Sequence, residues 1–190
     1  MKKILFYIAA AIAALTISSC QKKFEPGTTA TKNLAGNWMV TVYVPSESDG
    51  GEIVYEPYTG CEILTYNTSA NVPTEMWLDD DVDYYFWDFK CKIDCNNDNQ
   101  TFGKDKTVYA NCDYESNVKI WGGKITNLGA TAPGSETIVD KIEFFAAFDD
   151  DDDEYLTPYY FVGYRKTGFP EDNDNFRDDW ESIPSVPEDF

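Results

Sequence analysis

Short stretches in which apolar side chains occupy every second position constrain the fold of this chain more than any other feature. In the first stretch, residues 38–44, the apolar face carries Trp38, Val40, Val42 and Val44. A period of two residues is typical of a β-strand with one buried face. Further strands are expected at residues 61–67, 75–79, 82–93, 107–112, 117–127, 137–148 and 155–166.

About eight strands joined by short turns predict an all-β protein. Sequential hairpins favour an antiparallel up-and-down barrel, with a β-sandwich as the alternative. An eight-stranded barrel has an interior that is filled by side chains or holds one small ligand. In the expected strand 82–93, the face predicted to be buried carries Tyr85, Trp87, Phe89, Cys91 and Ile93.

The N-terminal residues 1–19 are typical of a signal peptide, because Lys2 and Lys3 precede an apolar run that is too short to span a bilayer permanently. The run ends at Ile17-Ser18-Ser19-Cys20, which resembles the lipobox of bacterial lipoproteins. That resemblance implies that Cys20 is acylated and anchors the protein to a membrane. An ordinary secretory signal with an incidental cysteine is the alternative.

The expected organisation is a signal peptide (1–19), a lipidated linker (20–33), one barrel domain (34–170) and an acidic tail (171–190). Gln21 is not the aspartate that marks inner-membrane retention in many lipoproteins. An outer-membrane location is therefore predicted, on the periplasmic face or the cell surface.

The charge of the chain excludes one class of partner. Its 34 acidic residues outnumber its 15 Lys and Arg, giving a net charge of −19. Such a charge repels nucleic acid, so no nucleic-acid partner is expected. The expected partners are the membrane, through the lipid anchor, and a small apolar molecule.

The chain lacks the usual groups of a hydrolase. It contains no histidine and no Gly-x-Ser-x-Gly motif, so a serine hydrolase mechanism has no visible base. The remaining route is a carboxylate pair, for which Asp88 and Asp140 are the candidates because each interrupts an apolar strand. Structural carboxylates are the preferred interpretation, and no catalytic residue is assigned.

The acidic run at 149–154 offers oxygen ligands that calcium prefers, with Asp149, Asp151 and Asp153 as the candidates. It lacks the spacing and the glycine of a calcium loop, so a solvated charge run is the preferred interpretation. The residues 79–83 are interpreted in the same way. No cofactor is expected.

Four cysteines follow Cys20, and export would allow them to form disulfides. They are Cys61, Cys91, Cys95 and Cys112. The sequence does not rank their pairings, and a bond from Cys112 to Cys91 or Cys95 is the working guess. The spacing does not match a zinc or thioredoxin-type redox site.

A family resemblance begins at Gly36-Asn37-Trp38, which looks like the Gly-x-Trp motif of lipocalins. In that family, the tryptophan closes one end of the barrel and an arginine of the last strand packs across it. Arg165 is in the matching place, and a cation over an indole is worth about 0.5 to 2 kcal/mol. The resemblance therefore implies a structural pair, Trp38 with Arg165.

The fuller run of motifs is similar to the lipocalin-like lipoproteins of Bacteroides and other Bacteroidota that are catalogued as lipid-binding putative hydrolases. The matching segments are Gly36–Trp38, Thr65–Thr68, Met76–Asp80, Phe86–Lys90 and Gly163–Asp172. They follow one another across nearly the whole expected domain. The resemblance implies a lipocalin-like (calycin) barrel that binds lipid or hydrolyses a substrate.

The predicted function is a lipid-anchored binding protein of the cell envelope for a small apolar or amphipathic ligand. Two alternatives stay open, a carboxylate-dependent hydrolase and a carbohydrate-binding accessory lipoprotein. Aromatic residues make up 16% of the chain and supply the candidate ligand contacts, although aromatic side chains in strands are mostly core. The candidates are Trp77, Trp87, Trp121, Phe144 and Tyr160.

Overall fold

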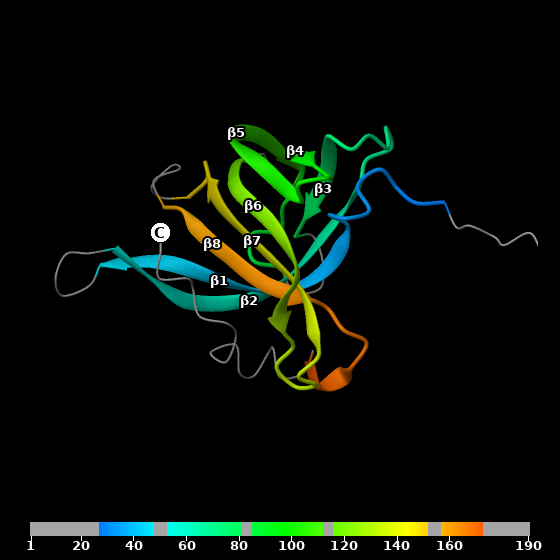
Figure 1. Cartoon of the computed structure of the whole chain (residues 1–190). Helices are drawn as coiled ribbons and strands as arrows, with labels where there is room; N and C mark the ends of the chain where they lie inside the picture. The colour runs from blue at the N-terminus through cyan, green and yellow to red at the C-terminus, as the bar shows by residue number, and fades with distance from the viewer. Residues whose placement is uncertain (1–26, 48–52, 81–84, 112–115, 152–156, 173–190) are drawn as a thin grey trace, which may run out of the picture.

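The computed structural model describes residues 27–47, 53–80, 85–111, 116–151 and 157–172. These residues form one sheet that closes on itself as a barrel (Figure 1). Its strands are β1 (Gly36–Glu47), β2 (Ile53–Asn67), β3 (Glu75–Asp79), β4 (Lys90–Asn96), β5 (Thr101–Asn111), β6 (Ser116–Thr131), β7 (Ile138–Phe148) and β8 (Tyr159–Arg165).

The connectivity is up-and-down throughout. Each strand runs antiparallel to the next, and β8 pairs back to β1 from Arg165 opposite Trp38 to Tyr160 opposite Tyr43. The lipocalin-like, all-β antiparallel barrel predicted from the sequence is confirmed, and the β-sandwich alternative is wrong. Alternate connections therefore lie at the same end of the barrel.

Side chains fill the inside of the barrel. In β1, Trp38, Val40 and Val42 are fully buried and belong to the main core, as predicted. The prediction of a half-buried strand is wrong, because Met39, Thr41 and Tyr43 on the other face are buried as well, Met39 and Tyr43 in separate clusters. Large rings from β7 and β8 pack beside the inward-facing residues of β1, where Phe144 and Phe161 stack with centroids 4.5 Å apart. The core is thus made by inward-facing residues contributed by all strands.

The strand predicted at residues 82–93 is wrong for residues 85–89, and residues 82–84 lie outside the described residues. The strand β4 begins only at Lys90, and residues 85–89 form a bend in which Asp88 has a positive φ of 55°. The backbone N–H groups of residues 86–88 bond to the carboxylate of Asp80 instead of to a neighbouring strand. Tyr85 is consequently 60% exposed and not part of a buried face.

Two strands begin earlier than predicted. Residues 53–60 of β2 pair only with residues 41–47 of β1. The two strand ends project from the barrel as a hairpin arm, residues 44–47 and 53–60 (Figure 1). Both faces of β2 are largely exposed there, so no alternation marks it. In β5, positive φ angles at Gly103 and Asp105 and a register shift break the pattern before residue 107.

Trp38 closes the end of the barrel at which β1 begins. Its Nε1–H donates to Thr65 Oγ1 at 2.8 Å, and the guanidinium carbon of Arg165 lies 4.4 Å from a centroid of its rings. Arg165 also donates to Ala35 O at 2.9 Å and to Asp140 Oδ2 at 3.0 Å. We call this the closed end, and the opposite end the mouth.

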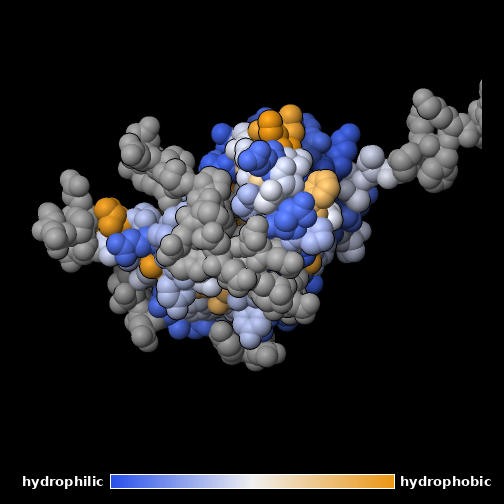
Figure 2. Space-filling model, turned by 90° about the horizontal axis from the view of Figure 1, so that it is seen from below, coloured by the Kyte–Doolittle hydropathy of each residue, from blue (hydrophilic) through white to orange (hydrophobic). Residues whose placement is uncertain are grey.

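The N-terminal predictions lie outside the described residues, including the signal peptide (1–19) and the lipidation site at Cys20. In the ranges that the structure describes, no helix has the length and apolar character needed to cross a membrane. On the face seen in Figure 2, the described surface is mostly hydrophilic, and hydrophobic residues form small separate groups.

Candidate functional site

Two rings from the β3–β4 connection plug the mouth. Phe86 packs on interior and rim rings, with its centroid 5.7 Å from that of Phe161 and 5.1 Å from that of Tyr159. Trp87 stacks on Phe148 with centroids 4.4 Å apart and planes 7° apart. Because Phe148 and Phe161 are fully buried, these contacts seal the filled interior from the mouth.

Asp80 holds this plug in place. Its side chain is fully buried, and its carboxylate accepts the N–H groups of Phe86 at 3.0 Å, Trp87 at 2.7 Å and Asp88 at 3.1 Å. Burial raises the pKa of the Asp80 carboxyl from 3.8 to about 7, although the three N–H groups favour the charged form. A perturbed carboxyl beside a cleft is typical of functional sites.

The outer side of the plug forms one wall of an open cleft. Its volume is about 510 Å³, within the range of small-molecule sites. The hairpin arm supplies the facing wall, and β8 supplies the floor near the first residue of that strand. The lining residues are Val44, Tyr58, Thr59, Tyr85, Phe86, Trp87 and Tyr159, five of which are aromatic.

Carboxylates of the β7–β8 connection bond to the walls of this cleft. Asp150 accepts the indole N–H of Trp87 at 3.0 and 3.1 Å, and Asp151 accepts the hydroxyl of Tyr159 at 2.9 Å. Asp150 is held in turn by Ser116 Oγ at 2.9 Å. The aromatic walls are therefore oriented by acidic side chains at the rim.

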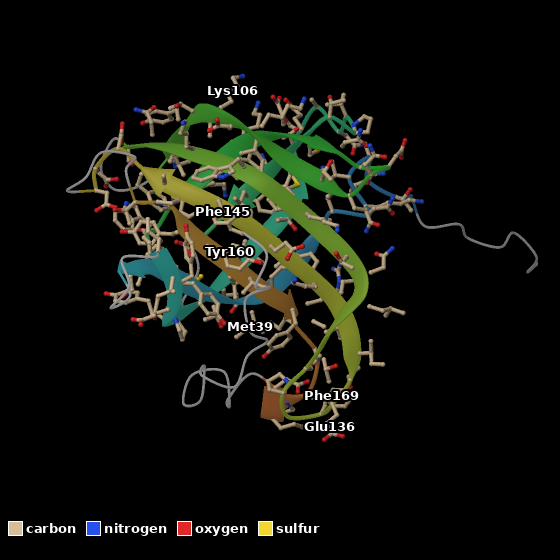
Figure 3. The ribbon with its side chains drawn as sticks, turned by 60° about the vertical axis from the view of Figure 1, so that its left-hand side comes forward. Met39, Lys106, Glu136, Phe145, Tyr160 and Phe169 are labelled. Carbon is tan, nitrogen blue, oxygen red and sulfur yellow. The ribbon has the colours of Figure 1, made fainter. Side chains whose placement is uncertain are left out.

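Of the five predicted ligand contacts, Trp87 lies at the cleft and the others do not. Phe144 is fully buried inside the barrel. Trp77 lies on the outer face of β3, where Lys90 and Lys92 each approach its ring to 5.8 Å. The rings of Tyr160 and Phe145 pack together outside the barrel wall, with centroids 4.9 Å apart (Figure 3). Trp121 stacks on the ring of Phe145, with centroids 5.5 Å apart.

The two catalytic candidates lie at opposite ends of the barrel. Asp140 accepts bonds from Arg165 Nε and Leu128 N at the closed end, whereas Asp88 belongs to the plug at the mouth. A carboxylate pair for glycoside cleavage needs a separation of about 5 to 10 Å across one bond. The structure therefore does not bring Asp88 and Asp140 together as such a pair.

The calcium candidates have hydrogen-bond partners of their own. Asp149 accepts bonds from the backbone and side chain of Asn117 at 2.8 and 2.7 Å, while Asp151 accepts one from Tyr159. Asp153 lies outside the described residues. Across the described ranges, no group of three or more His, Cys, Asp or Glu side chains has the geometry to hold a metal ion.

The cysteine prediction is wrong for the two residues that can be examined. Cys91 and Cys95 are free thiols, and both side chains point into the core from β4. Cys112, the predicted disulfide partner of one of them, lies outside the described residues. Burial raises the pKa of the Cys95 thiol to about 11 and that of Cys91 further, so neither is an activated nucleophile.

Sequence reasoning missed Asp80 and most of the cleft. Asp80 was assigned to a solvated acidic turn, although it occupies the inward position that continues from Met76 and Leu78. A signal was present in residues 84–87, where four consecutive aromatic residues occupy both faces of the expected strand. A half-buried strand exposes one of those faces, so such a run favours a plug over a regular strand.

The family model described as "Lipid-binding putative hydrolase" matches residues 23–170, which include the whole barrel. None of the curated proteins matches this chain.

Proposed function

Because this chain belongs to the "Lipid-binding putative hydrolase" family, we propose that it binds a small apolar or amphipathic molecule in the aromatic cleft at the barrel mouth. The observation that carries the proposal is the combination of a filled interior with an open cleft of about 510 Å³ lined by five aromatic residues. Burial of an apolar ligand against such rings is favourable at about 25 cal/mol per Å².

The plug directs the ligand to the mouth rather than to the centre of the barrel. The ring centroid of Phe86 lies 6.4 Å from that of Phe148 and 5.7 Å from that of Phe161. The ring of Trp87 stacks on Phe148. A ligand deep in the barrel would have to displace these contacts and the three N–H bonds to Asp80. The cleft outside the plug requires no such change.

Binding, rather than hydrolysis, is the activity that the residues favour. The chain has no histidine, and the two carboxylates that interrupt apolar strands lie at opposite ends of the barrel. The buried carboxylate behind the plug, Asp80, directs its oxygens to backbone N–H groups of the plug. The hydrolase part of the family description therefore finds no support in these residues.

Titration of the purified protein with dodecanol, followed by calorimetry, tests the proposal. We expect saturable one-to-one binding that weakens about tenfold or more in Trp87→Ala, because a central aromatic contact is worth about 2 kcal/mol. Trp121→Ala is the matched control, since Trp121 lies on the outer wall and should leave the affinity unchanged. Absence of binding, or equal loss in both variants, would contradict the proposal.

The proposal includes a lipid anchor at Cys20 in the cell envelope, with the barrel at the outer membrane. The segment Ile17-Ser18-Ser19-Cys20 supports it, and Gln21 favours the outer over the inner membrane. Metabolic labelling with a palmitate analogue tests the anchor. The label should appear on the wild-type protein and disappear in Cys20→Ser, and label retained by Cys20→Ser would refute lipidation at this residue.

A further inference from the structure

The charge of the barrel differs between its two ends. The up-and-down topology brings the β3–β4 and β7–β8 connections to the mouth. Their described residues, 80, 85–89, 149–151 and 157–158, include five acidic residues and no Lys or Arg. The three connections at the closed end are 68–74, 97–100 and 132–137. Their acidic residues are Asp98 and Glu136. The mouth is therefore the acidic end.

Four polar hydrogens of Phe86, Trp87 and Tyr159 in the cleft walls are already directed at carboxylates. The indole N–H of Trp87 bonds to Asp150, and the hydroxyl of Tyr159 bonds to Asp151. The backbone N–H groups of Phe86 and Trp87 bond to Asp80 behind the plug. An anionic head group would find these donors occupied, and it would face the carboxylates that occupy them.

The walls also offer π faces. None of the described residues that line the cleft is Lys or Arg, and the rings of Tyr58, Tyr85, Phe86, Trp87 and Tyr159 contribute to its surface. Aromatic faces attract cations, and quaternary ammonium groups are recognised by clusters of such rings. The negative carboxylates of Asp150 and Asp151 at the rim attract the same cations.

We propose that the cleft selects amphiphiles with a cationic, ammonium-type head and an apolar tail, and discriminates against fatty-acid-type anions. This inference rests on the proposed function, because it names the ligand class for the same site. The head lies between the rings and the carboxylates of Asp150 and Asp151. The tail lies along Val44 and Phe86.

Three probes with the same tail separate the charge of the head from the apolar contact. Decyltrimethylammonium, decanol and decyl sulfate are titrated into the purified protein by calorimetry, below their micelle concentrations. We expect the ammonium probe to bind at least about tenfold more tightly than decyl sulfate, with decanol between them. Added salt should reduce the preference, because exposed charges are screened.

Variants locate the effect at the rim. In D150N/D151N, the amide oxygens can still accept the bonds from Trp87 and Tyr159, but both charges are removed. The ratio of the affinity for the ammonium probe to the affinity for decanol should fall several-fold in this variant. Asp98→Asn, at the closed end, is the matched control and should leave the preference unchanged.

The outcomes distinguish this inference from the function on which it rests. Equal binding of all three probes, or tightest binding of decyl sulfate, overturns the cationic head while leaving apolar binding at the cleft intact. A preference that persists in D150N/D151N overturns the role of the rim carboxylates. Failure of all three probes to bind overturns the proposed function itself.

Discussion

Replacing Asp80 by asparagine should remove a pH dependence of stability that the wild-type protein carries between about pH 4 and pH 7. Burial raises the pKa of the Asp80 carboxyl from 3.8 to about 7, so the folded state binds the proton more tightly than the unfolded chain. The free energy of unfolding therefore falls as the pH rises through this interval. At about 1.4 kcal/mol for each pH unit, the loss amounts to about 4 kcal/mol.

Two effects compete at this carboxyl, and their balance sets the sign. The N–H groups of Phe86, Trp87 and Asp88 stabilise the charged form, which lowers the pKa. Loss of hydration and the nearby Asp88 charge raise the pKa, and loss of hydration is the largest contribution. Asparagine carries no proton to lose, so its contribution to stability does not change with pH.

Urea unfolding of both proteins at several values from about pH 4 to about pH 8 gives the required comparison. The other acidic residues act on both proteins, so the difference between the two unfolding free energies isolates Asp80. That difference should move by up to about 4 kcal/mol in favour of Asp80→Asn as the pH rises. Asp98→Asn, an exposed carboxyl in a turn, is the control for loss of one negative charge.

The result that would refute this reasoning is a pair of parallel stability curves. If wild type and Asp80→Asn change equally between about pH 4 and pH 8, burial does not dominate at this site. A difference that moves in favour of the wild type would mean that the backbone N–H groups dominate. The Asp80 carboxylate would then stabilise the plug most strongly at neutral pH.

Three further substitutions test the closed end and its neighbourhood by urea unfolding. Gly36→Ala should cost about 1 to 3 kcal/mol, because a Cβ there would lie 2.8 Å from the ring of Trp38, whereas Gly168→Ala meets no atom within 4 Å and serves as the control. Thr65→Val should cost about 1 to 3 kcal/mol by leaving the Trp38 N–H without its acceptor, and Thr65→Ser, which keeps the hydroxyl, should cost less. Asp172→Asn should cost about 1 to 3 kcal/mol at neutral pH. Burial opposes ionisation of Asp172, but hydrogen bonds from Thr167, Ser135 and Gly134 lower its pKa overall, so this cost should shrink as the pH falls below about 4.

The closed end could be predicted from the sequence because its determinants are local and regular. The strand containing Trp38 alternates cleanly, and the last strand of a closed barrel must return beside the first. These two facts bring Arg165 to the same end as Trp38 without any knowledge of the loops, and Arg165 is indeed opposite Trp38 in the pairing of β1 with β8. The all-β class followed from the same alternation in β3, β6 and β7.

The mouth could not be predicted in this way, because tertiary contacts override the strand pattern there. Residues 85–89 have strong strand propensity, yet the buried carboxylate of Asp80 collects their backbone N–H groups. The hairpin arm lacks a buried face, so its first residues in β2 give no periodic signal. These two irregular segments supply most of the cleft. This explains why Trp87 was the one cleft residue that the sequence predicted as a ligand contact.

The contrast between the two tryptophans at the ends of the barrel supports the mouth as the place for a ligand. Trp38 donates its N–H to a neutral hydroxyl and carries the guanidinium of Arg165 on its ring, so the protein already supplies both of its polar partners. Trp87 donates its N–H to the carboxylate of Asp150, and one face of its ring rests on Phe148. Among the described residues, no Lys or Arg lies over Trp87, and the ring contributes to the cleft. A cation supplied by a ligand would complete at the mouth the arrangement that Arg165 completes at the closed end.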